Sequence, residues 1–156
     1  IEHDPSALGQ AVTVIVIAGV AALIGNIFRS GFSAGVYALI MSLIGYAIWS
    51  VVVTLIGTKL MPEPTTKADF AETFRTVGFA ASPGVFNVLA IIPFLGVLIS
   101  FLIGLWSLVI MVIAVRVVLD YTSTARAIVV VLIGWCIYMF VIFVLGLMFG
   151  LSAMMR

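Results

Sequence analysis

Long apolar runs, nearly free of charge, alternate with short polar stretches along the chain. A helix needs about 20 mostly apolar residues to cross a bilayer, and the period-two alternation typical of strands is missing. In lipid, backbone polar groups must find partners within their own segment, so long uniform runs indicate helices. The pattern predicts an all-α, polytopic integral membrane helical bundle of about five transmembrane helices. We expect a single membrane domain over residues 1–156 with spans at about 11–28, 36–60, 70–92, 97–119 and 127–149.

Two polar stretches separate the first three spans. The sequence RSGFSAG (residues 29–35) is rich in glycine and serine and predicts a short turn. The stretch 59–75 holds six of the chain's thirteen charged residues. Within it, Thr66 is a candidate helix cap with Asp69 three residues on, and the apolar residues that follow recur at helical spacing. An amphipathic turn is therefore expected where the third span begins.

The third span contains residues that interrupt helices. Pro83 removes one helical hydrogen bond and clashes with the preceding turn, and Ser82 and Gly84 flank it. We expect a kink at Ser82–Gly84, with this span packed inside the bundle. Pro93 and Gly96 predict a tight hairpin between spans three and four. A kink and a turn without chemistry are one interpretation, and a kinked span marking a transport pathway is the other.

Composition fixes the environment of the molecule. Hydrophobic residues make up 65% of the chain and charged residues 8%, whereas a typical soluble domain has about 25% charged residues. Most of the surface must therefore face a lipid bilayer. The net charge is +1 and no run of basic residues occurs, so no nucleic-acid partner is expected.

The distribution of basic residues predicts the orientation in the membrane. With five spans, five of the seven fall on the N-terminal side, and Arg29 and Arg156 fall on the other. Cytoplasmic loops carry an excess of Lys and Arg. The N-terminus is expected in the cytoplasm and the C-terminus outside, with these five residues on the cytoplasmic side: Lys59, Lys67, Arg75, Arg116 and Arg126.

A short motif in the third span resembles a known family. The sequence GFAASP, with Gly78, Phe79 and Pro83, is similar to the G-Y/F-x-x-x-P pattern of the Yip family of Ypt/Rab-interacting membrane proteins. The surrounding FAETFRTV and IIPFLGVLISFLIGLWSLVIMVIAVR resemble its prokaryotic branch. The resemblance implies five spans with a cytosolic N-terminus.

Family members in eukaryotes act in vesicle trafficking and bind Rab-type GTPases and one another. Their separate Asp-Leu-Tyr-Gly-Pro-type motif is absent from this sequence. A Rab-type GTPase partner is therefore not expected for this chain. The short loops resemble bacterial relatives and point to a bacterial cytoplasmic membrane.

Residues that could carry chemistry are few. No cluster of His, Cys and carboxylates suits a metal, and no motif suggests a cofactor, so we expect neither and no enzymatic activity. Four charged residues lie near the expected cytoplasmic edge: Glu72, Arg75, Arg116 and Asp120. The first two are three apart and the last two four apart, so each pair could bond on one helix face. They could anchor the topology, join spans three and four, or form a headgroup or partner site.

Small residues spaced four apart let helices approach closely. Ala18 and Ala22 in the first span and Gly146 and Gly150 in the fifth have this spacing. They could serve packing within the bundle or contact with another subunit.

Together these features predict a non-enzymatic membrane organiser, adaptor or accessory subunit that contacts other membrane proteins, or itself, through helix faces. The alternative is a small transporter or channel for lipid or a small solute. Few polar residues could line its path: Asn26, Ser42, Thr54, Asn87 and Ser100.

Overall fold

The computed structural model describes residues 7–92 and 95–154, with the side chains of 29, 30, 142, 145, 146 and 148–154 left outside the described set. This part of the chain contains helices and no strand. Five helices are long and apolar enough to cross a membrane, which confirms the predicted all-α, five-span fold. The elements are α1 (Ala7–Ser30), α2 (Phe32–Leu55), a π-helical continuation η1 (Ile56–Leu60), α3 (Phe70–Phe79), a 3-10 helix η2 (Ser82–Ile91), α4 (Gly96–Val118) and α5 (Thr124–Met154).

The turn between α1 and α2 is shorter than the sequence suggested. A seven-residue turn over 29–35 is wrong in extent, because α1 continues to Ser30 and α2 begins at Phe32. Gly31 alone reverses the chain, with φ 79° and ψ 165°, a conformation that is essentially open only to glycine. Its N–H donates to the carbonyl of Ile27 at 3.0 Å, which completes the last turn of α1.

The N-cap of α3 lies three residues after the predicted cap, Thr66. This N-cap is Asp69, whose carboxylate accepts from the N–H of Glu72 at 2.7 Å, while the Glu72 side chain accepts from the N–H of Asp69 at 3.2 Å. This reciprocal capping box satisfies two helix-end donors. Thr66 as the helix cap was therefore wrong, because its hydroxyl bonds within the connector and to the end of α4.

The third span is broken, as the prolines predicted. The α-helix ends at Phe79, the bend lies at residues 80–81, and the 3-10 helix η2 starts at Ser82. The bend thus comes just before the expected Ser82–Gly84. A proline clashes with the carbonyl four residues earlier, and for Pro83 that residue is Phe79, the last of α3.

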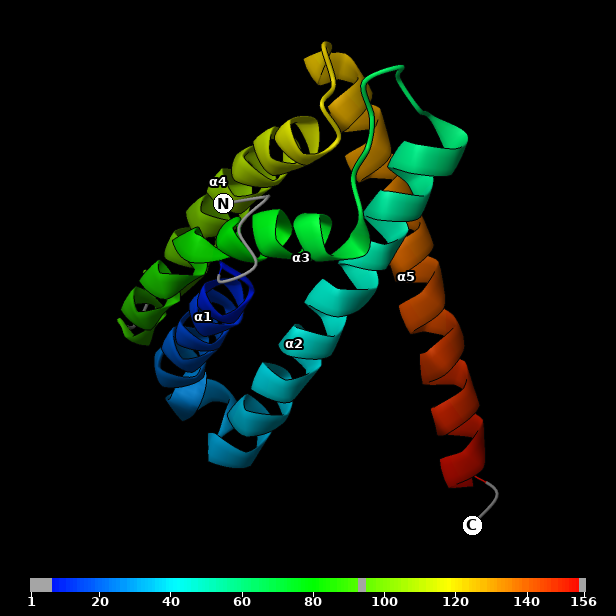
Figure 1. Cartoon of the computed structure of the whole chain (residues 1–156). Coiled ribbons are helices and arrows are strands. Elements are labelled where there is room, and N and C mark those ends of the chain that lie inside the picture. Colours follow the sequence, from blue (N-terminus) through cyan, green and yellow to red (C-terminus); the bar gives the residue numbers. More distant parts are fainter. Residues whose placement is uncertain (1–6, 93–94, 155–156) are drawn as a thin grey trace.

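Figure 1 shows α3 lying across the bundle between α1 and α2, whereas η2 runs beside α1. The other side of η2 packs on α4, where the rings of Phe86 and Trp106 stack with centroids 5.5 Å apart. The core lies where α2, α4 and α5 meet below the polar loops. It includes Val53, Val115 and Val130, none of which is exposed.

Small residues let α1 lie close to the end of α3 and to η2. A Cβ on Gly78 would lie 2.9 Å from the Cβ of Ala11, and one on Gly84 would lie 2.8 Å from the Cβ of Ala18. A Cβ on Gly25 would overlap the carbonyl oxygen of Asn87. The three α1 positions in these contacts, 11, 18 and 25, are seven residues apart and so lie on one helix face.

The 3-10 geometry of η2 lets a short segment extend further along α1 than an α-helix of the same number of residues. The fourteen residues from 11 to 25 rise about 21 Å along α1 at about 1.5 Å each. Within η2, which starts at Ser82, the five steps from 82 to 87 would cover about 7.5 Å as an α-helix and about 10 Å at the 3-10 rise of about 2.0 Å. The stretched helix therefore keeps pace with α1 more closely than an α-helix would.

Candidate functional site

A network of hydrogen bonds joins the two polar loops at one end of the bundle. We call this the polar cap, comprising residues 61–69 and 119–126. The Glu63 carboxylate is 7% exposed and accepts from both the N–H and the hydroxyl of Thr122 at 3.1 Å. It also pairs with the Arg126 guanidinium at 3.4 Å, although Arg126 is 47% exposed. One carboxylate therefore ties the α2–α3 connector to the start of α5.

Tyr121 and Thr66 add further links across the polar cap. The Tyr121 side chain is buried and its hydroxyl donates to the carbonyl of Met61 at 2.7 Å. Burial raises the pKa of Tyr121, the charge of Arg126 lowers it, and Glu63 raises it. The Thr66 hydroxyl donates at 2.9 Å to the carbonyl of Leu119, which follows the last residue of α4. The connector thus satisfies a carbonyl that the end of α4 leaves without a helical partner.

Two of the four predicted edge charges lie at the end of α4. The Arg116 guanidinium donates to the hydroxyl of Thr124 at 2.9 Å and to the carbonyls of Tyr121 and Thr122 at 3.3 Å. Asp120 has φ 52°, in the left-handed region where Asn and Asp are enriched. Arg116 therefore holds the loop through its carbonyls and a hydroxyl.

The other two edge charges lie on α3. Glu72 closes the capping box described above. Arg75 is buried, with 7% of its surface exposed, on a helix that contacts α1, α2 and α4. A buried arginine is rare in a membrane-spanning segment, and Arg75 lies on a helix that contacts three others.

Next to the polar cap, α5 packs on α2 through aromatic rings. Trp49 is buried, and its ring meets that of Tyr138 edge-on with centroids 6.2 Å apart. Its indole N–H also donates to the sulfur of Met111 at 3.3 Å. A Cβ on Gly134 would lie 3.1 Å from the Trp49 ring, so this glycine lets the ring approach the α5 backbone.

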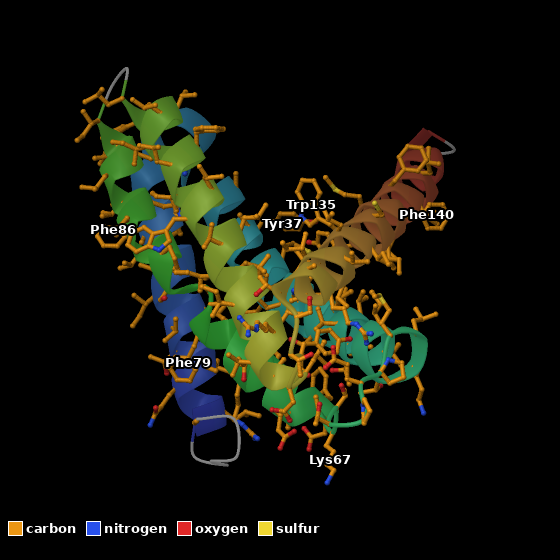
Figure 2. All side chains as sticks on the ribbon, turned by 90° about the horizontal axis from the view of Figure 1, so that it is seen from above. Tyr37, Lys67, Phe79, Phe86, Trp135 and Phe140 are labelled. Carbon is orange, nitrogen blue, oxygen red and sulfur yellow. The ribbon has the colours of Figure 1, made fainter. Side chains whose placement is uncertain are left out.

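Toward its C-terminal end, α5 separates from α4 and its neighbours in both views (Figures 1 and 2). Figure 2 shows Phe140 at the outer part of this arm. Six of the large apolar side chains in this part of α5 are 49–66% exposed. We call the following set the α5 face: Leu132, Trp135, Met139, Phe140, Phe143 and Leu147.

The glycine pair of the fifth span relates to this face by spacing alone. Gly146 and Gly150 lie in α5, and their surroundings fall outside the described residues. They follow Met139 and Phe143 by seven residues each, and residues seven apart share a helix face. The periodicity therefore places two glycines in line with the exposed side chains of the α5 face.

The remaining small-residue and motif positions lie within or beside the bundle. Ala18 faces Gly84 of η2, whereas Ala22 lines a cavity between α1 and α2. Among the motif residues, Gly78 and Pro83 are buried, Phe79 ends α3 and Ser82 is exposed. Gly96 opens α4, where a Cβ would meet the carbonyl oxygen of Ala90, and Pro93 lies outside the described residues.

The five polar residues proposed for a transport path do not share one place. Asn26 and Ser42 line the α1–α2 cavity. The Thr54 hydroxyl lies 2.8 Å from both the Ser50 carbonyl and the Thr73 hydroxyl. Asn87 donates to the carbonyl of Gly84 at 3.0 Å, and Ser100 is half-buried on α4. Within the part of the chain that the structure describes, three or more metal-ligating side chains nowhere gather.

Sequence reasoning missed the polar cap and the long contact of α1 with η2. Glu63 and Thr122 are 59 residues apart, so neither one signals the other. Two local signals were present. The spacing Asp69-x-x-Glu72 is a capping box, and the spacing of Ala11, Ala18 and Gly25 marks a small-residue face.

Comparison with protein-family models gives a match to the Yip1 domain over residues 1–148. No curated protein and no solved structure matches the chain.

Proposed function

This chain belongs to the Yip family, and we propose that it is a non-enzymatic membrane organiser, adaptor or accessory subunit. It would bind transmembrane helices of other membrane proteins, or of a second copy, inside the bilayer. The α5 face is the observation that carries this proposal. Its six large apolar side chains project from a helix that leaves the bundle.

The chemistry of the α5 face suits helix association in lipid. Apolar burial gives little driving force between helices there, so close packing and small residues dominate. Gly146 and Gly150 would let a partner backbone approach, and the exposed rings of Phe140 and Phe143 would pack at its sides. Aromatic side chains and Met are also enriched in protein interfaces.

The polar cap supports this role mechanically. Glu63, Arg126 and Tyr121 tie the start of α5 to the connector, and Trp49 supports its middle. A helix held firmly at two levels keeps its far end at a defined angle to the bundle. The partner would therefore meet a preformed surface and would not have to order it, which reduces the entropic cost of binding.

The basic residues favour an N-terminus and a polar cap on the cytoplasmic side and a C-terminus outside. Lys67, at the outer edge of the polar cap in Figure 2, and Arg126 would then face the anionic cytoplasmic leaflet. The bacterial cytoplasmic membrane is the location that we propose. The partners that we propose are membrane proteins other than Rab-type GTPases.

The size of the assembly after gentle solubilisation of native membranes tests the proposal. We expect Gly146→Leu, Gly150→Leu and Phe143→Ala to shift the protein to a smaller species on a native gel. Phe101→Ala is the matched control, because Phe101 is 66% exposed on α4 and Phe143 is 63% exposed on α5. Unchanged migration of both glycine variants would count against the α5 face.

A further inference from the structure

A cavity of about 280 Å³ lies between α1 and α2, on the side of the bundle where the two helices turn. Its walls include Gly19, Ala22 and Asn26 of α1, the turn residue Gly31, and Ala38 and Ser42 of α2. Ala38 is exposed, so the cavity opens on the outside of the hairpin. We call it the hairpin cavity.

Reciprocal contacts between glycine and leucine shape the hairpin cavity. Leu39 of α2 fills the space in front of Gly19, and Leu23 of α1 lies where a Cβ on Gly35 would come within 2.7 Å of its Cγ. These two large side chains are taken up between the helices. The rest of the wall consists largely of glycines and alanines, which leave the space open.

The hairpin cavity has the depth of one membrane leaflet. From Gly31 it extends to Gly19 on α1, twelve residues away, or about 18 Å at the helical rise. On α2 it extends to Ser42, eleven residues from the turn, or about 16 Å. Half of the hydrocarbon core of a bilayer is about 15 Å thick. The cavity therefore runs from the membrane edge to about the bilayer centre.

The hydrogen-bonding capacity of the cavity wall is greater near the turn than at the deep end. Asn26 lies five residues from the turn, and one amide hydrogen donates to the carbonyl of Ala22 at 3.0 Å. A side-chain amide has a second N–H and an acceptor oxygen, so Asn26 has further hydrogen-bonding capacity near the membrane edge. At the deep end, the Ser42 hydroxyl donates to the carbonyl of Leu39 at 2.7 Å, which leaves that end without a free donor.

We propose that the hairpin cavity binds one acyl chain of a membrane phospholipid, with the ester carbonyl accepting a hydrogen bond from Asn26. The lipid would come from the leaflet on the side of the α1–α2 turn. Its chain would lie along Gly19, Ala22 and Ala38. A volume of about 280 Å³ is too small for a helix of this length, whose diameter with side chains is about 10 Å, and the medium at the opening is lipid. This site is separate from the α5 face and does not depend on the proposed function.

Photolabelling tests this site. The purified full chain is reconstituted in phosphatidylethanolamine and phosphatidylglycerol vesicles doped with a phosphatidylethanolamine that carries a diazirine in its acyl chain. After irradiation, labelled peptides are quantified by mass spectrometry. We expect labelling to concentrate within residues 19–42. Equal labelling of the exposed apolar residues of α4 and α5 would overturn the proposal.

Matched variants sharpen the result. Ala38→Leu fills the hairpin cavity from its exposed wall and should lower labelling of residues 19–42 several-fold. Gly104→Leu is the control, because nothing lies within 4 Å of a Cβ at this position on α4, and its labelling should match that of the unmodified protein. Unchanged labelling in Ala38→Leu, with thermal unfolding equal to that of the control, would refute the cavity as the site. Asn26→Leu should also lower labelling several-fold. Unchanged labelling in this variant would contradict the hydrogen bond between Asn26 and the ester carbonyl.

Discussion

Replacing Gly25 by alanine tests the contact between α1 and η2. The added Cβ would overlap the carbonyl oxygen of Asn87, lie 2.9 Å from its carbonyl carbon and lie 3.3 Å from the Cβ of Ala90. The first two are backbone atoms of η2, so no side-chain rotation relieves the overlap. The helices must move apart.

The size of this movement sets the expected loss of stability. Nonbonded carbons are optimally about 3.5–4.0 Å apart, so the 2.9 Å contact must widen by at least about 0.6 Å, and the overlap with the Asn87 oxygen requires more. A gap of about 0.5–1 Å forfeits about a quarter to a half of the attraction at each contact. Ala18 and Gly84 share this interface and would separate too.

We expect a cost near the upper end of the usual range for overpacking, about 3 kcal/mol. The higher helix propensity of alanine offsets about 1 kcal/mol of it. The net loss in free energy of unfolding should therefore be about 2 kcal/mol.

The assay is unfolding of the purified protein in mixed micelles by titration with a denaturing detergent. Gly104→Ala on α4 is the control, because a Cβ there meets nothing within 4 Å, and its stability should be unchanged or slightly higher. If Gly25→Ala unfolded like Gly104→Ala, α1 and η2 would not be in backbone contact at Asn87. The explanation of the stretched third span would then be refuted.

Two further predictions concern the polar cap and use the same unfolding assay. Glu63→Ala should lower stability by about 1.5–3 kcal/mol, because it removes two hydrogen bonds that Thr122 donates to a nearly buried carboxylate, whereas Arg126→Ala, at a half-exposed partner, should cost under about 1 kcal/mol. Equal losses of stability in the two variants would contradict the role of Glu63 as the buried residue that joins the two loops. Tyr121→Phe should cost about 0.5–1.5 kcal/mol, because it removes the bond to Met61. Since the pKa of Tyr121 is raised above its ordinary 10.0, its contribution is present below that pH and is lost as pH rises through the raised value. The difference between the unmodified protein and Tyr121→Phe should therefore shrink above about pH 10, and a constant difference would contradict this.

The number of spans could be predicted from the sequence because the physics is local. Each apolar run must satisfy its own backbone in lipid, so a run's length fixes a helix wherever its neighbours lie. The break in the third span was equally local, since Pro83 excludes the helical bond to Phe79. The close contact of η2 with Ala18 and Gly25 of α1 joins distant parts of the chain, so no local pattern predicts it.

The candidate site was less accessible to sequence reasoning. The capping residue was ambiguous, because Thr66 and Asp69 each have an acidic residue three positions on. Asp69 caps the helix because the Thr66 hydroxyl donates a hydrogen bond to the end of α4 instead. The polar cap joins residues about 60 apart, such as Tyr121 and Met61. The exposure of the α5 face follows from the angle at which α5 leaves the bundle, which no run of residues encodes alone.

The most direct test of the α5 face is site-specific photocrosslinking in native membranes. A photoreactive phenylalanine analogue replaces Phe143 in one variant and Phe101 in another, since these two positions on α5 and α4 are similarly exposed. We predict that position 143 yields a protein–protein adduct of discrete mass, either with a second copy or with a different membrane protein, and that position 101 yields lipid adducts. Lipid adducts alone at position 143, or the same products at both positions, would contradict the account.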